Sequence, residues 1–339
     1  MANQKTILVT GGCGFIGSHF VRHWLKRHPD FRVVNLDKLT YSGNPKNLED
    51  VAQNKNYIFI KSSIADNEKV AAVFKKYKPD YLVNFAAETH VDRSVHEGAK
   101  PFLDANIYGA YALLEAIKEY GLEKAVFVST DEVYGSLPLK SKNKFTEKTQ
   151  YAPRSPYSAS KAAGDLLCHA YYSTWKLPVI VTHCSNNYGT HQYPEKLIPF
   201  FTLRALKNKS LPLYGKGENI RDWIHVLDHV EGIEHALLKG MAGEVYNMGG
   251  DDERPNIAIA RAILDILKKL RSLITFVADR PGHDQRYAIG HSKITRELGW
   301  MPRRSFDKML PYTVKWYIDN PRWTKSIRGE ITRVNSHIK

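Results

Sequence analysis

The chain has 339 residues, of which 43% are hydrophobic and 25% charged, a balance that is ordinary for a globular enzyme with a substantial core. Lysine and arginine total 49 against 35 aspartates and glutamates, and the formal charge of +14 favours anionic partners such as phosphorylated small molecules. The basic residues are scattered, and no apolar stretch approaches the roughly 18 residues of a transmembrane helix, which argues against nucleic-acid and membrane partners.

Short apolar runs alternate with amphipathic stretches through the first half of the chain. The runs rich in Val, Ile and Phe predict strands at 6–10, 31–37, 57–60, 80–86, 125–130 and 177–184. Helical patterns lie between them at about 15–28, 67–78, 101–120 and 156–175. This alternation predicts an α/β fold with a Rossmann-type doubly wound parallel sheet. After about residue 187 the loops thicken, and we expect a smaller mixed α/β substrate-binding region over the ends of the strands.

The first predicted strand leads into a glycine-rich turn and then a helix, in "TILVTGGCGFIGSHF". Gly12, Gly14 and Gly17 fit the pattern G-x-G-x-x-G, and Gly11 extends it. Such a turn lets the backbone approach a pyrophosphate, which then meets the free N–H groups at the start of the helix. Asp37 ends the second predicted strand twenty residues after Gly17, where a carboxylate binds a ribose 2′-hydroxyl. The spacing favours NAD over NADP, although Lys38 is adjacent to Asp37.

Two further patterns carry chemistry. "VFVSTDEVYG" places two adjacent carboxylates, Asp131 and Glu132, where a buried strand ends, although their mutual repulsion does nothing for strand stability. "SPYSASKAAGD" places Tyr157 and Lys161 four apart on one helix face, where the ammonium is expected to lower the pKa of the phenol. Taken alone, Tyr-x-x-x-Lys also occurs by chance on exposed helices.

Together these motifs resemble the nucleotide-sugar-modifying branch of the extended short-chain dehydrogenases/reductases, and within it the 4,6-dehydratases. The segments that carry the resemblance run from residue 10 to about 289: "TGGCGFIGSHF", "LDKLTYSGN", "NFAAETHVDRS", "STDEVYG", "SPYSASKAAGD", "CSNNYG", "PEKLIP", "NIRDWIHV" and "DRPGHDQRYAI".

The resemblance implies that a nucleotide-activated glucose, with dTDP-glucose favoured, is oxidised at C4, loses water across C5–C6 and is reduced at C6, with tightly bound NAD regenerated in each turnover. It implies that Asp131 is the acid at the C6 oxygen, Glu132 the base at C5, and Thr130 the hydroxyl that orients O4. Tyr157 and Lys161 complete the catalytic set. The alternatives are a UDP-sugar 4,6-dehydratase, a 4-epimerase of the same scaffold, and a non-catalytic NAD-binding regulator.

The resemblance also implies two sets of binding residues. The cofactor set is Gly11, Gly14, Phe15, Ile16, Gly17, Asp37, Lys38, Leu39, Thr40, Ser63, Ile64, Ala86, Ala87, Ser129, Tyr157, Lys161 and Asn187. The substrate set is Thr89, Thr130, Asn186, Glu195, Lys196, Leu197, Pro212, Tyr214, Arg221, Asn256, Arg280, His283 and Tyr287. The chain departs from the family pattern at Ser63, Thr89 and Ala105, which affects the expected adenine contact rather than the acid, base, tyrosine or lysine.

The remaining expectations concern organisation. The NAD-binding domain is expected to comprise 1–189 with 223–257 and 312–334, and the nucleotide-sugar-binding domain 190–222 with 258–311. The family implies a homodimer formed through the helices at about 101–120 and 156–175. No zinc-type spacing of histidines or cysteines occurs, so we expect no metal. Cys13, Cys168 and Cys184 do not form a disulfide framework, and the first residues contain no secretory leader, so we expect a cytoplasmic protein.

Overall fold

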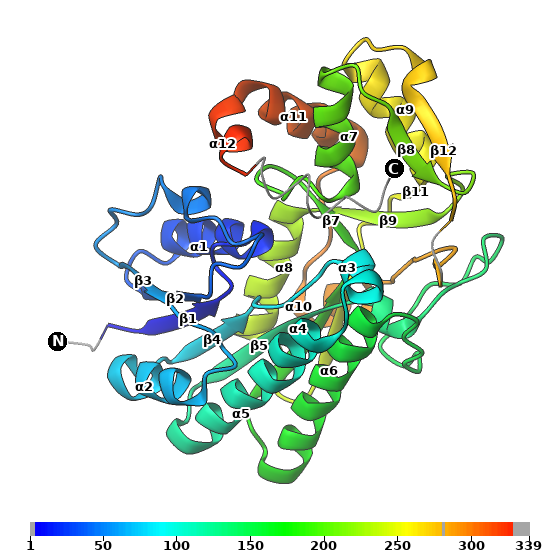
Figure 1. Cartoon of the computed structure of the whole chain (residues 1–339). Coiled ribbons are helices and arrows are strands. Elements are labelled where there is room, and N and C mark those ends of the chain that lie inside the picture. Colours follow the sequence, from blue (N-terminus) through cyan, green and yellow to red (C-terminus); the bar gives the residue numbers. More distant parts are fainter. Residues whose placement is uncertain (1–3, 280–281, 328–339) are drawn as a thin grey trace.

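A seven-stranded parallel sheet forms the centre of the molecule, in the order β10-β6-β5-β4-β1-β2-β3 (Figure 1). The computed structural model describes residues 4–279 and 282–327. The strands of this sheet are β1 (Thr6–Thr10), β2 (Arg32–Asp37), β3 (Tyr57–Lys61), β4 (Tyr81–Asn84), β5 (Lys124–Thr130), β6 (Val179–Cys184) and β10 (Val245–Met248).

Helices cover both faces of this sheet (Figure 1). One face carries α1 (Phe15–Arg27), α8 (Val226–Lys239) and α10 (Ser292–Leu298). The other carries α2 (Asn67–Tyr77), α5 (Gly109–Tyr120) and α6 (Pro156–Trp175). Successive strand residues point to opposite faces of the sheet. Ile7 and Val9 belong to the hydrophobic cluster on the first face, whereas Leu8 belongs to the cluster on the second. Both faces are therefore apolar, which is why these strands read as continuous hydrophobic runs.

A second group of elements surrounds its own core beyond the carboxyl ends of the strands. It contains a three-stranded sheet in the order β11-β9-β7 and a parallel pair formed by β12 and β8. Its strands are β7 (Asn186–Tyr188), β8 (Leu211–Tyr214), β9 (Ile220–His225), β11 (Glu253–Pro255) and β12 (Ile274–Val277). Its helices are α7 (Leu197–Leu206), α9 (Asn256–Ile266) and α11 (Phe306–Asp319), which pack against one another.

The remaining helical elements are short. They are η1 (Pro45–Leu48), α3 (Val91–His96), α4 (Lys100–Phe102), η2 (Leu103–Tyr108), η3 (Asp131–Tyr134), η4 (Arg271–Leu273) and α12 (Pro321–Ser326). Within the described residues, no helix is both long enough and apolar enough to cross a bilayer.

The structure confirms the six predicted strands and the four predicted helices, with ends shifted by up to two residues. The helix expected at 101–120 is interrupted by a π-helical segment, η2, between α4 and α5. The sequence reading did not assign β10, the seventh strand, or the bounds of α8. Helix α11 crosses the expected boundary at residue 312 and packs against α7 and α9. The division into two domains stays a prediction.

The order of the strands reverses between β1 and β4. The chain proceeds outward from β1 to β2 and β3, then returns to β4 and continues through β5 and β6 in the other direction. At such a switch point the loops after neighbouring strands diverge and leave a crevice at the carboxyl edge of the sheet, where open α/β sheets bind ligands.

Candidate active site

A cavity of about 770 Å³ lies at this crevice. Its walls come from the carboxyl ends of six strands: the turn after β1, the end of β2, the loops after β3 and β4, and the ends of β5 and β6. Such a volume is within the range of a small-molecule or cofactor site.

The glycine turn after β1 forms one wall. Gly11 has φ +70, and a Cβ at this position would lie 2.6 Å from the backbone nitrogen of Ala86. A Cβ on Gly17 would overlap the carbonyl oxygen of Gly11, so the helix can approach the turn this closely only with glycine there. Helix α1 has no side-chain cap and no acidic residue in its first turn, which leaves its N–H groups directed at the cavity for an anionic group.

Asp37 stands at the end of β2, beside this turn. Its Oδ2 accepts from the Cys13 N–H at 2.9 Å, and its Oδ1 accepts from the Leu39 N–H at 2.7 Å. Burial raises the pKa of the Asp37 carboxyl, and the two backbone donors oppose this shift. The carboxylate is thereby fixed at the cavity wall, where it can accept hydrogen bonds from a diol.

Almost the whole predicted cofactor set lines this one cavity. The members that do so are Gly11, Gly14, Phe15, Ile16, Gly17, Asp37, Lys38, Thr40, Ser63, Ile64, Ala86, Ala87, Ser129, Tyr157, Lys161 and Asn187. Leu39 is not in the lining, although its N–H holds Asp37. Ala105, one of the departures from the family pattern, also lines the cavity.

Tyr157 and Lys161 lie on the first turns of α6 and are both buried. The Lys161 ammonium donates to the Val128 carbonyl at 2.8 Å, and burial lowers its pKa. The expectation of a lowered pKa at Tyr157 is not met in this structure. Burial raises the pKa of Tyr157 well above its ordinary value and the Glu132 charge adds to this, whereas the Thr130 hydroxyl lowers it.

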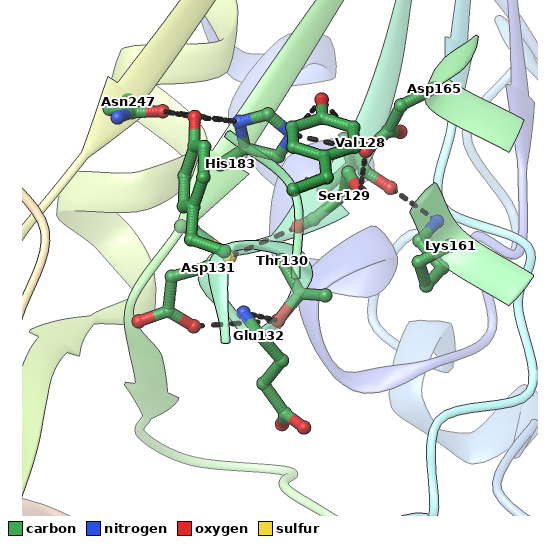
Figure 2. A network of polar contacts seen from close by, with 12 residues as sticks. Val128, Ser129, Thr130, Asp131, Glu132, Lys161, Asp165, His183 and Asn247 are labelled. Atoms are coloured by element: carbon green, nitrogen blue, oxygen red, sulfur yellow. Dashed lines mark hydrogen bonds and ion pairs between the residues drawn. The ribbon is translucent and has the colours of Figure 1, made fainter. Parts of the chain in front are cut away.

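The acid pair occupies the short turn η3, which follows directly from β5 (Figure 2). Thr130 caps this turn by accepting from the Glu132 N–H at 3.3 Å, and its hydroxyl donates to Asp131 Oδ1 at 3.4 Å. Asp131 is buried, and its Oδ2 has no hydrogen-bond partner within the described residues. Burial, followed by the charges of Glu132 and Asp222, raises the pKa of Asp131 well above its ordinary value. The pair is thus arranged to hold one proton.

Thr130, Asp131, Glu132, Tyr157 and Lys161 all line the same cavity. A sugar bound there would meet a phenol, a buried carboxylic acid and a second carboxylate. These groups can move protons at neighbouring carbons of one ring.

The predicted substrate residues are divided by the structure. Thr89, Thr130, Asn186, Glu195 and Lys196 line the cavity. Leu197, Pro212, Tyr214, Arg221, Asn256, His283 and Tyr287 lie outside its lining, and Arg280 lies outside the described residues.

One of these outer residues, Arg221, still acts on the acid pair. Arg221 is buried, lies over the Tyr287 ring at 4.3 Å, and its charge lowers the pKa of Asp131. Its guanidinium donates to the backbone oxygens of Ile220 and Asp284. Arg221 is thus near the acid pair but outside the cavity lining, and its role in binding the substrate stays a prediction.

Glu195 also lines the cavity. Tyr41 donates to its Oε1 at 3.0 Å, and Lys196 Nζ lies 3.7 Å from the same oxygen. Burial raises the pKa of Glu195 to about 7.

Sequence reasoning missed Asn106, in the π-helical segment η2. Its amide accepts from the Glu88 N–H at 3.0 Å and donates to the Glu88 carbonyl and to Ser160 Oγ at 3.1 and 2.8 Å. Asn106 thus fixes the loop after β4 against α6, and π-helical segments are frequent at such sites. An asparagine inside an apolar helical pattern was the available signal.

No group of three or more metal-ligating side chains occurs among the residues that the structure describes. The three cysteines are buried and unpaired.

Comparisons with known proteins agree with this geometry. The family model of GDP-mannose 4,6 dehydratase matches residues 8–313. The dTDP-glucose 4,6-dehydratase of Salmonella typhimurium is 47% identical over 346 residues, covering 95% of both chains.

Solved structures resemble the whole chain. The dTDP-glucose 4,6-dehydratase of Bacillus anthracis in complex with NAD superposes with a TM-score of 0.89 at 47% identity, covering 95% of this chain and 99% of that one. A UDP-glucose 4-epimerase of Thermotoga maritima with UDP-glucose has a TM-score of 0.85 at 30% identity, covering 93% and 99%. The scaffold is thus shared with epimerases, while the identity is higher with the dehydratase.

Proposed function

The chain belongs to the dTDP-glucose 4,6-dehydratase family, and we propose from this membership and from the site that it converts dTDP-glucose to the 4-keto-6-deoxy sugar and water. The observation that carries the proposal is the buried Asp131, with an unpartnered oxygen and a raised pKa, in the same cavity as Tyr157 and the glycine turn. The enzyme is an NAD-dependent hydro-lyase.

The residues present fit NAD. The glycine turn and the N-terminus of α1 would hold the pyrophosphate, and Asp37 the ribose hydroxyls, because each presents the matching donors or acceptor to the cavity. When bound there, NAD would supply the hydride acceptor for oxidation at C4 and the hydride donor for reduction at C6.

The chain's own groups handle the protons. Tyr157 removes the proton from the O4 hydroxyl, with Lys161, one helical turn away, as the cation of this chain that favours the phenolate. Once C4 is a ketone, the C5 proton is acidic and Glu132 removes it. Asp131, which burial keeps protonated, gives its proton to the departing C6 hydroxyl. Afterwards Glu132 returns a proton to C5.

A 4-epimerase returns the hydrogen to C4 and needs neither a base at C5 nor an acid at O6. Placing two carboxylates side by side in a buried turn costs free energy, because desolvation and mutual repulsion both oppose it. Elimination of water is the step that uses them.

The test is incubation of the purified protein with dTDP-glucose and UDP-glucose in parallel. We expect dTDP-glucose to lose the mass of one water and to give a 4-keto product that absorbs in alkali. An epimerised product of unchanged mass would contradict the proposal, and faster turnover of UDP-glucose would reassign the nucleobase.

We also propose that the protein is a cytoplasmic homodimer. Support for a dimer comes from large apolar side chains exposed along η2, α5 and α6, namely Leu103, Tyr108, Tyr111, Tyr120, Leu166 and Trp175. A second copy that covers these two helices would remove this surface from water.

A further inference from the structure

His183 is a fully buried histidine on β6, behind the catalytic groups, and the proposed mechanism does not use it. Figure 2 shows its imidazole between Asp165 and Asn247, on the side of β5 away from Glu132. Both ring nitrogens have partners, and these partners belong to different parts of the catalytic machinery.

The Nε2 atom of His183 contacts α6, the helix that carries Tyr157 and Lys161. His183 Nε2 lies 3.0 Å from Oδ2 of Asp165, which is on α6 four residues after Lys161. Because a carboxylate only accepts, Nε2 carries the hydrogen of this contact. The same oxygen accepts from Ser129 Oγ at 2.8 Å, at the end of β5.

The Nδ1 atom of His183 contacts η3, the turn that carries Asp131 and Glu132. His183 Nδ1 lies 2.8 Å from the hydroxyl of Tyr134, the last residue of η3, three positions after Asp131. The Tyr134 hydroxyl also lies 2.9 Å from Asn247 Oδ1, a contact between the turn and β10.

We propose that His183 is a positioning residue that holds the acid-pair turn η3 in register with helix α6, so that the groups for oxidation at C4 and those for elimination at C5–C6 face the same sugar. The inference rests on the proposed function. Only a side chain with hydrogen-bonding atoms at both ends of a rigid ring can join Asp165 and Tyr134 in this way. The two halves of the site also meet through apolar packing of Val133 and Tyr134 on Ala162 of α6, so His183 adds a polar link with defined geometry to this contact.

Three substitutions separate the two contacts. His183→Gln places an amide nitrogen near the position of Nε2 and keeps a donor for Asp165, but leaves the Tyr134 hydroxyl without this partner. His183→Asn places its amide near Nδ1 and keeps the contact to Tyr134, but loses the one to Asp165. Tyr134→Phe removes the hydroxyl alone, with the least change of shape.

Single-turnover experiments with dTDP-glucose provide the readouts. They follow the near-ultraviolet absorbance of the reduced cofactor, exchange of the C5 proton with deuterated solvent, and release of product. For His183→Gln and Tyr134→Phe we expect C4 oxidation within about twofold of the parent, and C5 exchange and product release roughly tenfold slower, because a small displacement of an acid or base strongly affects its rate. The reduced cofactor should therefore accumulate. His183→Asn should instead slow C4 oxidation, without accumulation.

Tyr246→Phe is the matched control. Tyr246 is fully buried on β10 beside Asn247, and its hydroxyl accepts from the Met241 N–H at 3.2 Å, away from the cavity. This variant should lose thermal stability to a similar extent as Tyr134→Phe while both half-reactions keep their ratio. The double variant His183→Gln/Tyr134→Phe should be no slower than the slower single variant, since both break one link.

The proposal is overturned if Tyr134→Phe and His183→Gln leave the ratio of oxidation to elimination unchanged, or lower both rates together as lost stability would. Failure of the function itself is distinguishable, because the parent protein would then release no dehydrated product in the same assay.

Discussion

Asp131 and Glu132 are neighbours with different environments, and this difference supports the proposed roles of Asp131 as acid and Glu132 as base. Asp131 is buried with a raised pKa, whereas Glu132 is half-buried at the cavity wall. We expect Asp131→Asn to lower product formation roughly 100- to 1000-fold, since an amide cannot give up a proton. Glu132→Gln should cause a similar loss and also abolish exchange of the C5 proton with solvent. Both are measured by product mass and by deuterium incorporation.

Glu49→Gln, at an exposed position outside the cavity, is the control for both substitutions and should leave the rates within about twofold of the parent. Full dehydration activity in either acid-pair variant would refute the assignment.

Glu195 should make stability depend on pH. Its pKa in the folded protein is raised from 4.5 to about 7 by burial, so the protonated form is favoured on folding. Its stabilising contribution is complete below about pH 4.5 and is lost as the pH rises towards 7. Relative to Glu195→Gln, which stays neutral, the free energy of unfolding of the parent should therefore fall by about 3 kcal/mol across this window. Urea unfolding at a series of pH values measures the difference.

Glu123→Gln supplies a control of opposite sign. Hydrogen bonds from Lys5 and Tyr81 lower the pKa of the exposed Glu123, so its contribution is present above the ordinary carboxyl pKa and is lost as the pH falls. A parent-minus-Glu195→Gln difference that is flat or rises between pH 4.5 and 7 would contradict the buried-acid interpretation.

At the scale of elements, the turn between β1 and α1 depends on glycine geometry. Gly11→Ala combines a left-handed φ with a contact of 2.6 Å to the Ala86 nitrogen, so we expect it to lower the free energy of unfolding by roughly 3 kcal/mol and to weaken NAD binding. Chemical unfolding and calorimetric titration with NAD measure the two effects.

Gly98→Ala is the matched control, because Gly98 also has a positive φ but a Cβ there meets nothing within 4 Å. It should cost only the backbone strain, roughly 1 kcal/mol, and leave NAD affinity unchanged. Equal costs for the two variants would show that the turn does not require the close approach to Ala86.

The predicted elements were recoverable because their signals are local. Strands covered on both faces appear as apolar runs, and the glycine turn, Tyr157–Lys161 and Asp131–Glu132 are contiguous motifs. β10 is four residues long, and its half-polar sequence "VYNM" gives no such run, so its place beside β6 is set by tertiary contacts.

The network around His183 was beyond sequence reasoning for a different reason. Its contacts join residues 18 to 64 positions apart, from Asp165 to Asn247, and only the folded sheet brings them together. The same applies to the pKa of Tyr157. The spacing to Lys161 suggested a lowered value, but complete burial, which spacing does not reveal, raises it.

At the scale of the whole molecule, the exposed apolar side chains on α5 and α6 support the proposed dimer. Leu166 is 58% exposed on α6. We expect the parent to sediment as a dimer and Leu166→Glu to weaken dimerisation at least about tenfold, since a charge would be buried in an apolar contact. Sedimentation velocity over a series of concentrations measures the change.

Met241→Glu is the matched control for this change, because Met241 is 59% exposed but lies outside α5 and α6. It adds the same charge and should leave the dimer intact. A parent that sediments as a monomer at all concentrations, or a Leu166→Glu variant that dimerises like Met241→Glu, would contradict assembly through these helices.

Tyr108 and Tyr111 line the cavity and are also exposed. Loss of the dimer should therefore also weaken NAD binding, which calorimetric titration of the Leu166→Glu variant with NAD would detect.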